Sequence, residues 1–341
     1  VKGGKAALSF RYRLETVDQD GVRKDATAST LKSRVSYKSA PYGNLTFSVE
    51  VDDVTYVGDD DFNNTRNGHT QYPVVADPGG TDINQAWLNY DAGNFSWRLG
   101  RQRINHGGQR FVGGVGWRPN EQTYDSLSVT GKVEDVATIN YAWVNRVSRI
   151  FGPEDGAPAK QLDGNIHLLN VAFPQVKGLS VHLYSMDFEE ADTFSNRTCG
   201  FSYGTTIEGD GFKVPIAAGW SRQSDTGDNP VSYDADYATL SVGIARGSTN
   251  VGIGIERLEG DSAPGGAFRT PLATRHKFQG WADKFLGTPA GGIDDRYLSV
   301  QHGFGPHKFT LVYHRFEPTE SGPRYGDEID ASWAWKLSDN Y

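Results

Sequence analysis

The sequence predicts an all-β fold, a transmembrane antiparallel up-and-down β-barrel of about sixteen strands. Three observations predict it. Apolar and polar residues alternate along about sixteen segments, the connections between them alternate between short and long, and the chain is rich in glycine and aromatic residues. Only 37% of the 341 residues are hydrophobic. We expect a single barrel domain over residues 1–341, in which half of each strand faces water.

The alternation within the segments is clearest in NLTFSVEVD, where Leu45, Phe47, Val49 and Val51 share one face opposite a polar one. The same period of two is found in TLKSRVSYK at 30–38, ATINYAWVNR at 137–146, FKVPIAAGWS at 212–221 and IDASWAW at 329–335.

The connections alternate in length along the chain. The short ones are expected at 39–43, 91–94, 131–136, 174–179, 208–212, 245–250 and 303–308. The long ones are expected at 19–28, 58–82, 106–120, 147–161, 188–195, 223–235, 259–292 and 316–327. Outer-membrane barrels have short periplasmic turns and longer extracellular loops, whereas a soluble sandwich has no reason to keep its two ends so different.

The width of the barrel decides which face is outside. A small soluble barrel would fill its interior with the apolar residues, but about sixteen strands enclose an interior too wide for side chains to fill. We therefore expect the apolar face to contact the lipid bilayer and lipopolysaccharide of a Gram-negative outer membrane. Aromatic residues near the strand ends are expected in interfacial girdles; they are Tyr12, Tyr37, Tyr90, Trp97, Tyr203, Trp220, Tyr313, Trp333 and Trp335.

Strand parity places a set of charged residues on the opposite, pore-lining face. They are Arg11, Arg13, Lys32, Arg34, Glu50, Asp52, Arg98, Lys213, Glu256, Asp330 and Lys336. The basic members concentrate in the first third of the chain, and arginines suit carboxylates or phosphates. The alternative is that mixed charges merely keep the lumen wet. Arg101 and Arg103 would share the lipid side with Leu99 unless a bulge intervenes.

The long connection 106–120, HGGQRFVGGVGWRPN, contains five glycines and can fold tightly. We expect it to enter the barrel and to place Arg110 and Arg118 in a constriction. The alternative is an exposed, flexible loop in which both arginines are incidental.

The connection 259–292 contains Phe278, Trp281, Lys284 and Phe285, whose apolar members recur at helical spacing. We expect a short amphipathic helix over part of 270–292 that serves as a plug or lid, with Thr274 as its cap.

The acidic run GDDDFNNTRNGH offers Asp59, Asp60 and Asp61 as oxygen ligands for a structural calcium ion. It lacks the spacing of a known calcium loop, so a solvated acidic loop is the alternative. No other cofactor is expected. The single cysteine, Cys199, excludes an internal disulfide framework, and the net charge of −8 argues against nucleic acid as a partner.

An enzyme is not expected. His106 and His182 lie near Asn105 and Ser180, but the chain has no GxSxG, HExxH or phosphate-binding glycine motif. With eight histidines in the chain, such neighbours arise by coincidence.

Two segments resemble the alginate-export family of Gram-negative outer-membrane porins. They are LGRQRINHGGQRFVGGVGWRPNEQTYD at 99–125 and TPLATRHKFQGWADKFLGTPAGGIDDRY at 270–297. The resemblance implies an outer-membrane barrel with a polar, arginine-rich channel, which in some members passes an anionic polysaccharide. Well-understood members resemble eighteen-stranded barrels. We therefore expect KLSDNY at 336–341 to be a turn that leads to a missing final hairpin, and sixteen-stranded closure is the alternative.

The functional prediction is a porin for diffusion of small hydrophilic, anionic solutes. A gated export channel or surface-binding barrel for an alginate-like polysaccharide, or an oligosaccharide, is the second hypothesis. A soluble carbohydrate-binding sandwich or propeller is the third. The sequence does not specify the solute, the pore radius, gating or the oligomeric state.

Overall fold

A computed structural model of the protein describes residues 3–261 and 265–338, which form an all-β structure. The strands are β1 (Lys5–Val17), β2 (Ala26–Lys38), β3 (Leu45–Tyr56), β4 (Gly80–Ala92), β5 (Phe95–Gln102), β6 (Thr123–Val133), β7 (Ala137–Ser148), β8 (Gln161–Ala172), β9 (Leu179–Phe188), β10 (Asn196–Gly209), β11 (Phe212–Asp225), β12 (Asp234–Arg246), β13 (Thr249–Leu258), β14 (Ile293–Phe304), β15 (His307–Glu317) and β16 (Gly326–Trp335).

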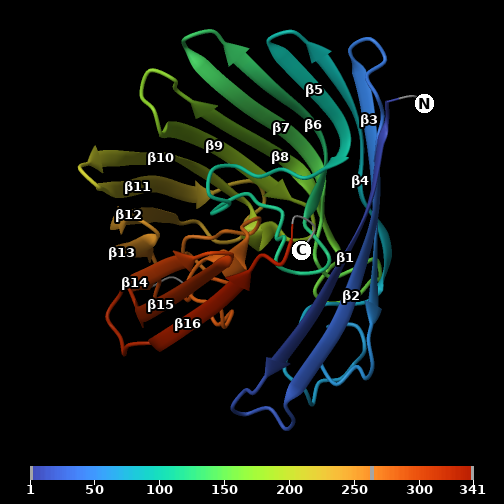
Figure 1. Ribbon diagram of the computed structural model, residues 1–341. Helices are drawn as coiled ribbons and strands as arrows, with labels where there is room; N and C mark the ends of the chain where they lie inside the picture. Colours follow the sequence, from blue (N-terminus) through green and yellow to red (C-terminus); the bar gives the residue numbers. More distant parts are fainter. Residues whose placement is uncertain (1–2, 262–264, 339–341) are drawn as a thin grey trace. The chain divides into compact units, whose positions relative to one another are not determined.

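Each strand pairs with its neighbour in chain order, from β1 to β16, in one sixteen-stranded antiparallel sheet (Figure 1). Short turns such as 93–94, 210–211 and 305–306 alternate with long connections such as 57–79, 103–122 and 259–292. Both the strand count and the alternation of connection lengths are therefore confirmed. The turn expected over KLSDNY at 336–341 falls partly on residues 339–341, which lie outside the described residues, and the missing final hairpin stays a prediction.

The chain divides into two compact units. The first comprises Val1–Lys132, Asn140–His167 and Phe188–Ala191, and the second comprises Val133–Ile139, Leu168–Asp187 and Asp192–Tyr341. The single domain over 1–341 stays a prediction.

The distribution of polar and apolar residues is inverted relative to a soluble protein. On β1, Leu8, Phe10 and Leu14 are 62%, 64% and 59% exposed, whereas Lys32 on β2 and Asp52 on β3 are buried. A continuous exposed apolar face is unfavourable in water and is stable against lipid. The predicted orientation, with apolar side chains outward, therefore agrees with the exposure of these residues.

Long connections cover part of the polar face. In the first unit, the connection 57–79 packs Phe62, Tyr72 and Val75 against Ala26 and Ala28 at the start of β2. These buried contacts give the unit a small conventional core outside the sheet itself.

The prediction of an amphipathic helix within 270–292 is wrong. The described residues contain two short 3₁₀ helices, Asp192–Phe194 and Arg275–Lys277, and no helix there is long and apolar enough to cross a membrane. Gln279, Gly280 and Asp283 have φ of 52°, 81° and 57°, which interrupts any helix. Thr274 precedes Arg275–Lys277 but makes no capping bond through its side chain.

The apolar residues of this connection pack individually instead. Phe285 lies 4.7 Å from the ring of Phe316 and 5.6 Å from that of Tyr325, measured between ring centroids. These tertiary contacts, rather than a helical face, account for the spacing of its aromatic residues.

Candidate functional site: a charged face covered by the 103–122 connection

Strand register places a set of basic and acidic side chains of the first unit on one surface. Arg11 pairs with Lys32 across β1 and β2, and Arg34 pairs with Asp52 across β2 and β3. Because side chains alternate along each strand, Arg13 and Glu50 share this face. We call this surface, on β1–β5, the charged face.

Glu121, from the connection 103–122, is the centre of one ion-pair network on the charged face. Its carboxylate accepts from Lys32 at 3.2 Å, Arg34 at 2.7 Å and the Nε of Arg103 at 2.7 Å, and Asn84 adds a hydrogen bond at 3.2 Å. Burial alone would raise the pKa of Glu121, but the charges of Lys32, Arg103 and Arg34 outweigh it and lower the pKa to about 2.

Arg34 joins the network to β3. Its Nε and one terminal nitrogen donate to the two carboxylate oxygens of Asp52, both at 2.6 Å, and a further nitrogen lies 3.3 Å from Glu50. Lys32 lies 3.0 Å from Asp52 as well. The network therefore links two strands to a connection that begins about seventy residues after Arg34 in sequence.

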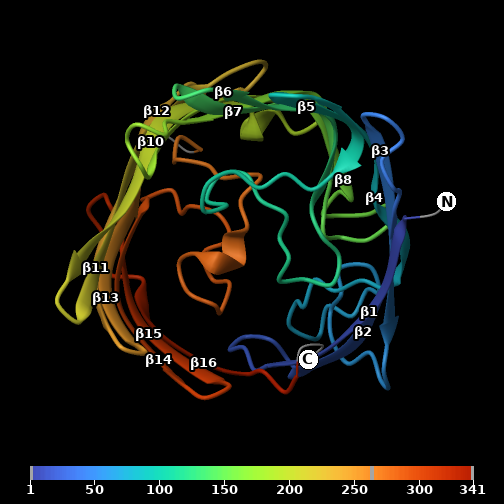
Figure 2. The ribbon, with the colours of Figure 1, turned by 45° about the horizontal axis from the view of Figure 1, so that its top comes forward.

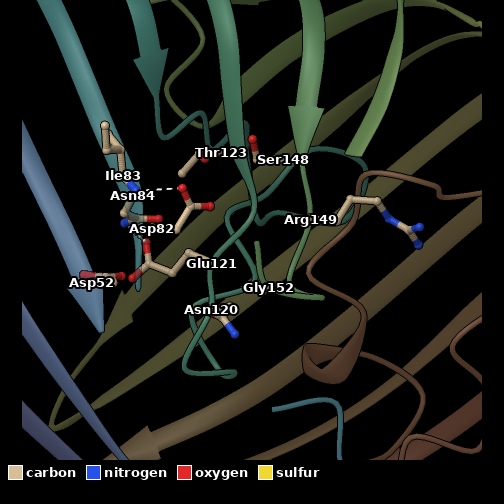
Figure 3. A pocket seen from close by; sticks show the side chains of 10 residues that line it. All are labelled: Asp52, Asp82, Ile83, Asn84, Asn120, Glu121, Thr123, Ser148, Arg149 and Gly152. Atoms are coloured by element: carbon tan, nitrogen blue, oxygen red, sulfur yellow. Dashed lines mark hydrogen bonds between the residues drawn. The ribbon is translucent and has the colours of Figure 1, made fainter. Parts of the chain in front are cut away.

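A small polar pocket adjoins this network. Figure 3 shows Asp52, Asn84, Asn120 and Glu121 around it, with the bond from Asn84 to Glu121 as a dashed line, while the Arg149 side chain is directed away. Carboxylate and amide groups thus dominate the lining near Glu121.

A second network surrounds Asp77, whose side chain is fully buried. Arg118 lies 3.3 Å from Asp77 and 3.0 Å from Glu15, and Arg13 lies 3.7 Å from Asp77 and also contacts Glu15. Burial is the largest influence and raises the pKa of Asp77, although Arg118 and Arg13 act in the opposite direction.

The connection 103–122 lies directly on the charged face. Arg11 donates to the carbonyl oxygens of Gly116 and Trp117 at 2.9 and 2.7 Å, and the Arg13 guanidinium lies 4.5 Å from the centroid of the Trp117 ring. Figure 2 shows the connection, in teal, on the concave side of the strands of its own unit. Arg110 and Arg118 are both buried.

Arg98 forms a separate basic group farther along β5. Its guanidinium lies 4.1 Å from the centroid of the Trp87 ring and donates to Asn89 at 3.2 Å. Lys38 lies 5.9 Å from the same ring centroid. Arg98 is half-buried and Lys38 is exposed, and contact with the ring does not neutralise either cation.

The two arginines whose parity was ambiguous point to different faces, and Gly100 lies just before them. Its φ of +118° belongs to backbone that side-chain-bearing residues rarely adopt. Arg103, beyond the end of β5, reaches Glu50 and Glu121 on the charged face. Arg101 instead pairs with Asp125 at 2.7 Å on the side of Leu99.

The second unit carries a different set of polar groups on its own covered face. Glu256 accepts from Tyr237 at 2.6 Å and from Gln279 of the connection 259–292, and the backbone nitrogen of Ala282 donates to Glu328 at 2.7 Å. His314 lies 2.8 Å from Asp295 and 3.5 Å from Asp330.

Other predicted residues lie apart from these networks. Lys213 pairs with Glu208 at 2.9 Å beside a short turn, and Lys336 follows β16. In the connection 259–292, Phe278 lies under Lys277, Trp281 is partly buried and Lys284 is exposed.

The acidic run contributes to local structure. Asp61 accepts from Tyr72 at 2.7 Å, and Asp60 lies 4.0 Å from His69. Within the described ranges no group of three His, Cys, Asp or Glu side chains could hold a metal ion, Asp59 included. Calcium binding therefore stays a prediction without a converging ligand set.

The histidines do not assemble a nucleophilic site with the residues considered from sequence. His182 bonds to Ser221 at 2.9 Å, whereas Ser180 bonds to Ser202. Burial lowers the pKa of His106 to about 4, so its ring is neutral at pH 7.

Sequence reasoning missed several members of the networks. Glu15 follows Arg11 and Arg13 at the same parity and could have been found from that pattern. Glu121, Asp77 and Gln279 lie in connections, where no period indicates the direction of a side chain. The sequence pattern placed Trp87 in a strand but did not predict that its ring contacts Arg98.

The fold and the polar face define a β-barrel of the porin class in the Gram-negative outer membrane. Residues 5–241 match the model of the alginate export family, so the chain belongs to that family. No curated protein matches the sequence.

Solved structures share the fold at low sequence identity. Acinetobacter baumannii OccAB2 is 16% identical with a TM-score of 0.69, over 93% of this chain and 81% of that chain. Pseudomonas aeruginosa OpdO is 13% identical with a TM-score of 0.68, over 98% and 96%. Pseudomonas aeruginosa OccD3 (OpdP) is 14% identical with a TM-score of 0.65, over 93% and 72%.

Proposed function

We propose that the protein is a diffusion channel for small hydrophilic, anionic solutes. The charged face lines the water-filled path, the connection 103–122 narrows it, and the long connections face the cell exterior. Charged side chains that line a pore set its ion preference. The lipid bilayer surrounds the exposed apolar face.

The anion preference is inferred from the cations of the charged face that no carboxylate of the described residues neutralises. Arg13, Lys32, Arg34, Arg103 and Arg118 all contact carboxylates. Arg11 instead donates to backbone carbonyls, and Arg98 to an amide oxygen. In the part of the chain that the structure describes, neither forms an ion pair, so both leave net positive charge on this face.

The test is the reversal potential of single channels in a planar bilayer under a salt gradient. Wild-type protein is expected to prefer anions, and the double variant Arg11→Gln with Arg98→Gln is expected to lose most of that preference. Arg246→Gln, at the opposite parity on β12, is the matched control and should not change it. Cation preference in the wild type, or an unchanged potential in the double variant, would contradict the proposal.

Arg110 and Arg118 test whether the connection 103–122 lies in the path. Arg110→Ala with Arg118→Ala removes two buried cations from the connection 103–122. If this connection narrows the path, the anion preference should fall and the conductance should rise. Unchanged conductance and selectivity in a folded channel would place the connection outside the path.

A gated channel that exports a polysaccharide is the second candidate, and one observation favours it. The connection 259–292 is held to the polar face of its own unit by Gln279 on Glu256 and by the Ala282 backbone on Glu328. Figure 2 shows this connection, in orange, on the concave side of its own strands.

Release of these two contacts should convert a closed channel into an open one. We expect Gln279→Ala with Glu328→Ala to increase the open fraction of single-channel records if the connection is a gate. Identical records for the variant and the wild type would leave free diffusion as the mode of transport. Lys213→Gln, which alters an exposed pair beside a short turn, is the control.

A further inference from the structure

Four arginines of the second unit lie together at the loop ends of β13, β14 and β15 and in the connection before β16. They are Arg257, Arg296, Arg315 and Arg324, and we call them the rim arginines. By strand parity Arg257, Arg296 and Arg315 lie on the apolar side, since Ile255, Leu298 and Tyr313 are the next residues of the same face. They therefore border the lipid-facing surface and are separate from the charged face.

The carboxylates of this cluster lie beneath the guanidinium groups. The side chain of Asp294 is 5% exposed, whereas those of its partners Arg257 and Arg296 are 46% and 54% exposed. Arg315 is 48% exposed above Glu317 at 25%. Asp327 is directly opposite Arg315 and lies 3.0 Å from Arg324, with side chains 32% and 47% exposed. The guanidinium groups are therefore the more exposed members of each pair, although every rim arginine faces a carboxylate.

Arg296 and Arg315 are directly opposite each other across β14 and β15. Like charges in directly opposed positions destabilise a sheet. Glu317 lies 3.2 Å from Arg296 and 2.7 Å from Arg315, so one carboxylate serves two guanidinium groups. Asp294 lies 4.0 Å from Arg296, and Asp327 is directly opposite Arg315. Each arginine has five N–H donors, so Glu317 and these carboxylates leave some of them for another anion.

We propose that Arg296 and Arg315 bind a phosphate group of a phosphorylated lipid in the outer leaflet, of the lipid A type. The phosphate would lie between the two guanidinium groups. The acyl chains of the lipid would follow Leu298, Val300 and Leu311, which are exposed on the same face. The direct continuity of the cations with this apolar surface favours a lipid over a free phosphate ion. The proposal rests on the proposed placement of the long connections at the cell exterior.

The experiment measures retention of a defined lipid A on purified, detergent-solubilised protein by native mass spectrometry. The double variant Arg296→Gln with Arg315→Gln is compared with the wild type. Loss of two charge-assisted contacts should weaken retention by about tenfold or more. Arg246→Gln is the matched control, because Arg246 lies on the same face at the opposite, short-turn end of β12. This variant should retain as much lipid A as the wild type.

Two results would overturn the proposal. One is equal retention by the double variant and the wild type, and the other is equal retention of lipid A from which both phosphates have been removed. Competition by inorganic phosphate that abolishes the difference without any dependence on acyl chains would show an ion site rather than a lipid site. Heat-modifiable migration confirms that the variants are folded.

A separate readout keeps this result distinct from the proposed function. The rim arginines lie away from the charged face, so the double variant should keep the reversal potential of the wild type. Loss of lipid retention with unchanged ion preference supports the lipid site alone. If the wild type fails to prefer anions while retention still depends on both arginines, the lipid site stands and the transport proposal falls.

Discussion

At the scale of single residues, the charged face depends on Arg34. Its bidentate contact with Asp52 and its bond to Glu121 join β2 to β3 and to the connection 103–122. The side chains of Arg34, Asp52 and Glu121 are 18%, 5% and 10% exposed. When one partner of such a network is removed, the remaining charges stay desolvated and uncompensated.

We therefore expect Arg34→Gln to lower the free energy of unfolding by about 3 kcal/mol. Lys32 still faces Asp52 and Glu121, which keeps the loss finite. Urea unfolding in phospholipid vesicles, followed by tryptophan fluorescence, measures the change, with Arg34→Lys as the partial rescue and Arg246→Gln as the neutral control. A change within about 0.5 kcal/mol for Arg34→Gln would show that the network does not stabilise the fold.

A second residue-scale prediction concerns how the packing of the connection 103–122 depends on pH. The pKa of His106 is lowered to about 4, from an ordinary value near 6.5. When the connection 103–122 detaches from the strands, His106 recovers its ordinary pKa and takes up a proton below pH 6.5. The packed form of the connection, which we call closed, therefore loses stability as the pH falls from about 6.5 towards 4. The lowered pKa of Glu121 stabilises closure above about 4.5, and this contribution is lost as the pH falls through about 2.

Hydrogen–deuterium exchange of residues 103–122, corrected for the intrinsic pH dependence, measures this loosening. We expect protection to decrease between pH 6.5 and 4 in the wild type and to stay nearly constant there in His106→Gln. Glu121→Gln should instead lower protection at every pH above 4.5. An identical pH profile for His106→Gln and the wild type would assign the loosening to another group.

At the scale of elements, the strands were predictable and the connections were not. A period of two is a local signal, and about sixteen segments carry it with glycine, proline, asparagine or aspartate at their ends. The contact of Glu121 with Lys32 joins residues 89 positions apart, and no local pattern encodes it. The expected helix at 270–292 failed because aromatic spacing alone does not exclude an irregular segment whose side chains pack separately.

Gly100 provides an element-scale prediction. A Cβ at this position would lie 2.3 Å from the carbonyl oxygen of Ala86 on β4, and the φ of +118° is strained for any side chain. We expect Gly100→Ala to lower the unfolding free energy by about 2–4 kcal/mol and to displace Arg103 from Glu121. Gly93→Ala, whose added Cβ meets nothing within 4 Å, is the control at the adjacent turn.

Both effects of Gly100→Ala are measurable. Vesicle unfolding reports the stability, and the salt-gradient reversal potential reports the altered charge near Glu121. Gly93 also has a positive φ, of +70°, so its variant carries backbone strain without the collision. Equal losses in both variants would mean that strain, rather than contact with Ala86, determines the role of Gly100.

At the scale of the whole molecule, the exposure of apolar residues and the burial of charged ones require a lipid environment. Leu240, Val242 and Ile244 on β12 are 54%, 40% and 52% exposed. In water such a surface would drive aggregation, whereas in a bilayer it is matched to hydrocarbon. The same alternation that allowed the fold to be predicted from sequence thus specifies where the protein is stable.

One pair of substitutions on β12 tests this orientation for the barrel. Leu240 lies near the middle of the strand on the exposed apolar face, and the preceding residue, Thr239, lies on the opposite face. An arginine that faces lipid near the bilayer midplane costs about 2–4 kcal/mol, whereas an arginine that faces a wet lumen costs little. We expect Leu240→Arg to lower the unfolding free energy in vesicles by that amount and Thr239→Arg to change it by less than about 1 kcal/mol. If Thr239→Arg is the more destabilising of the two, then the faces are assigned the wrong way round, and both the charged face and the rim arginines would exchange their surroundings.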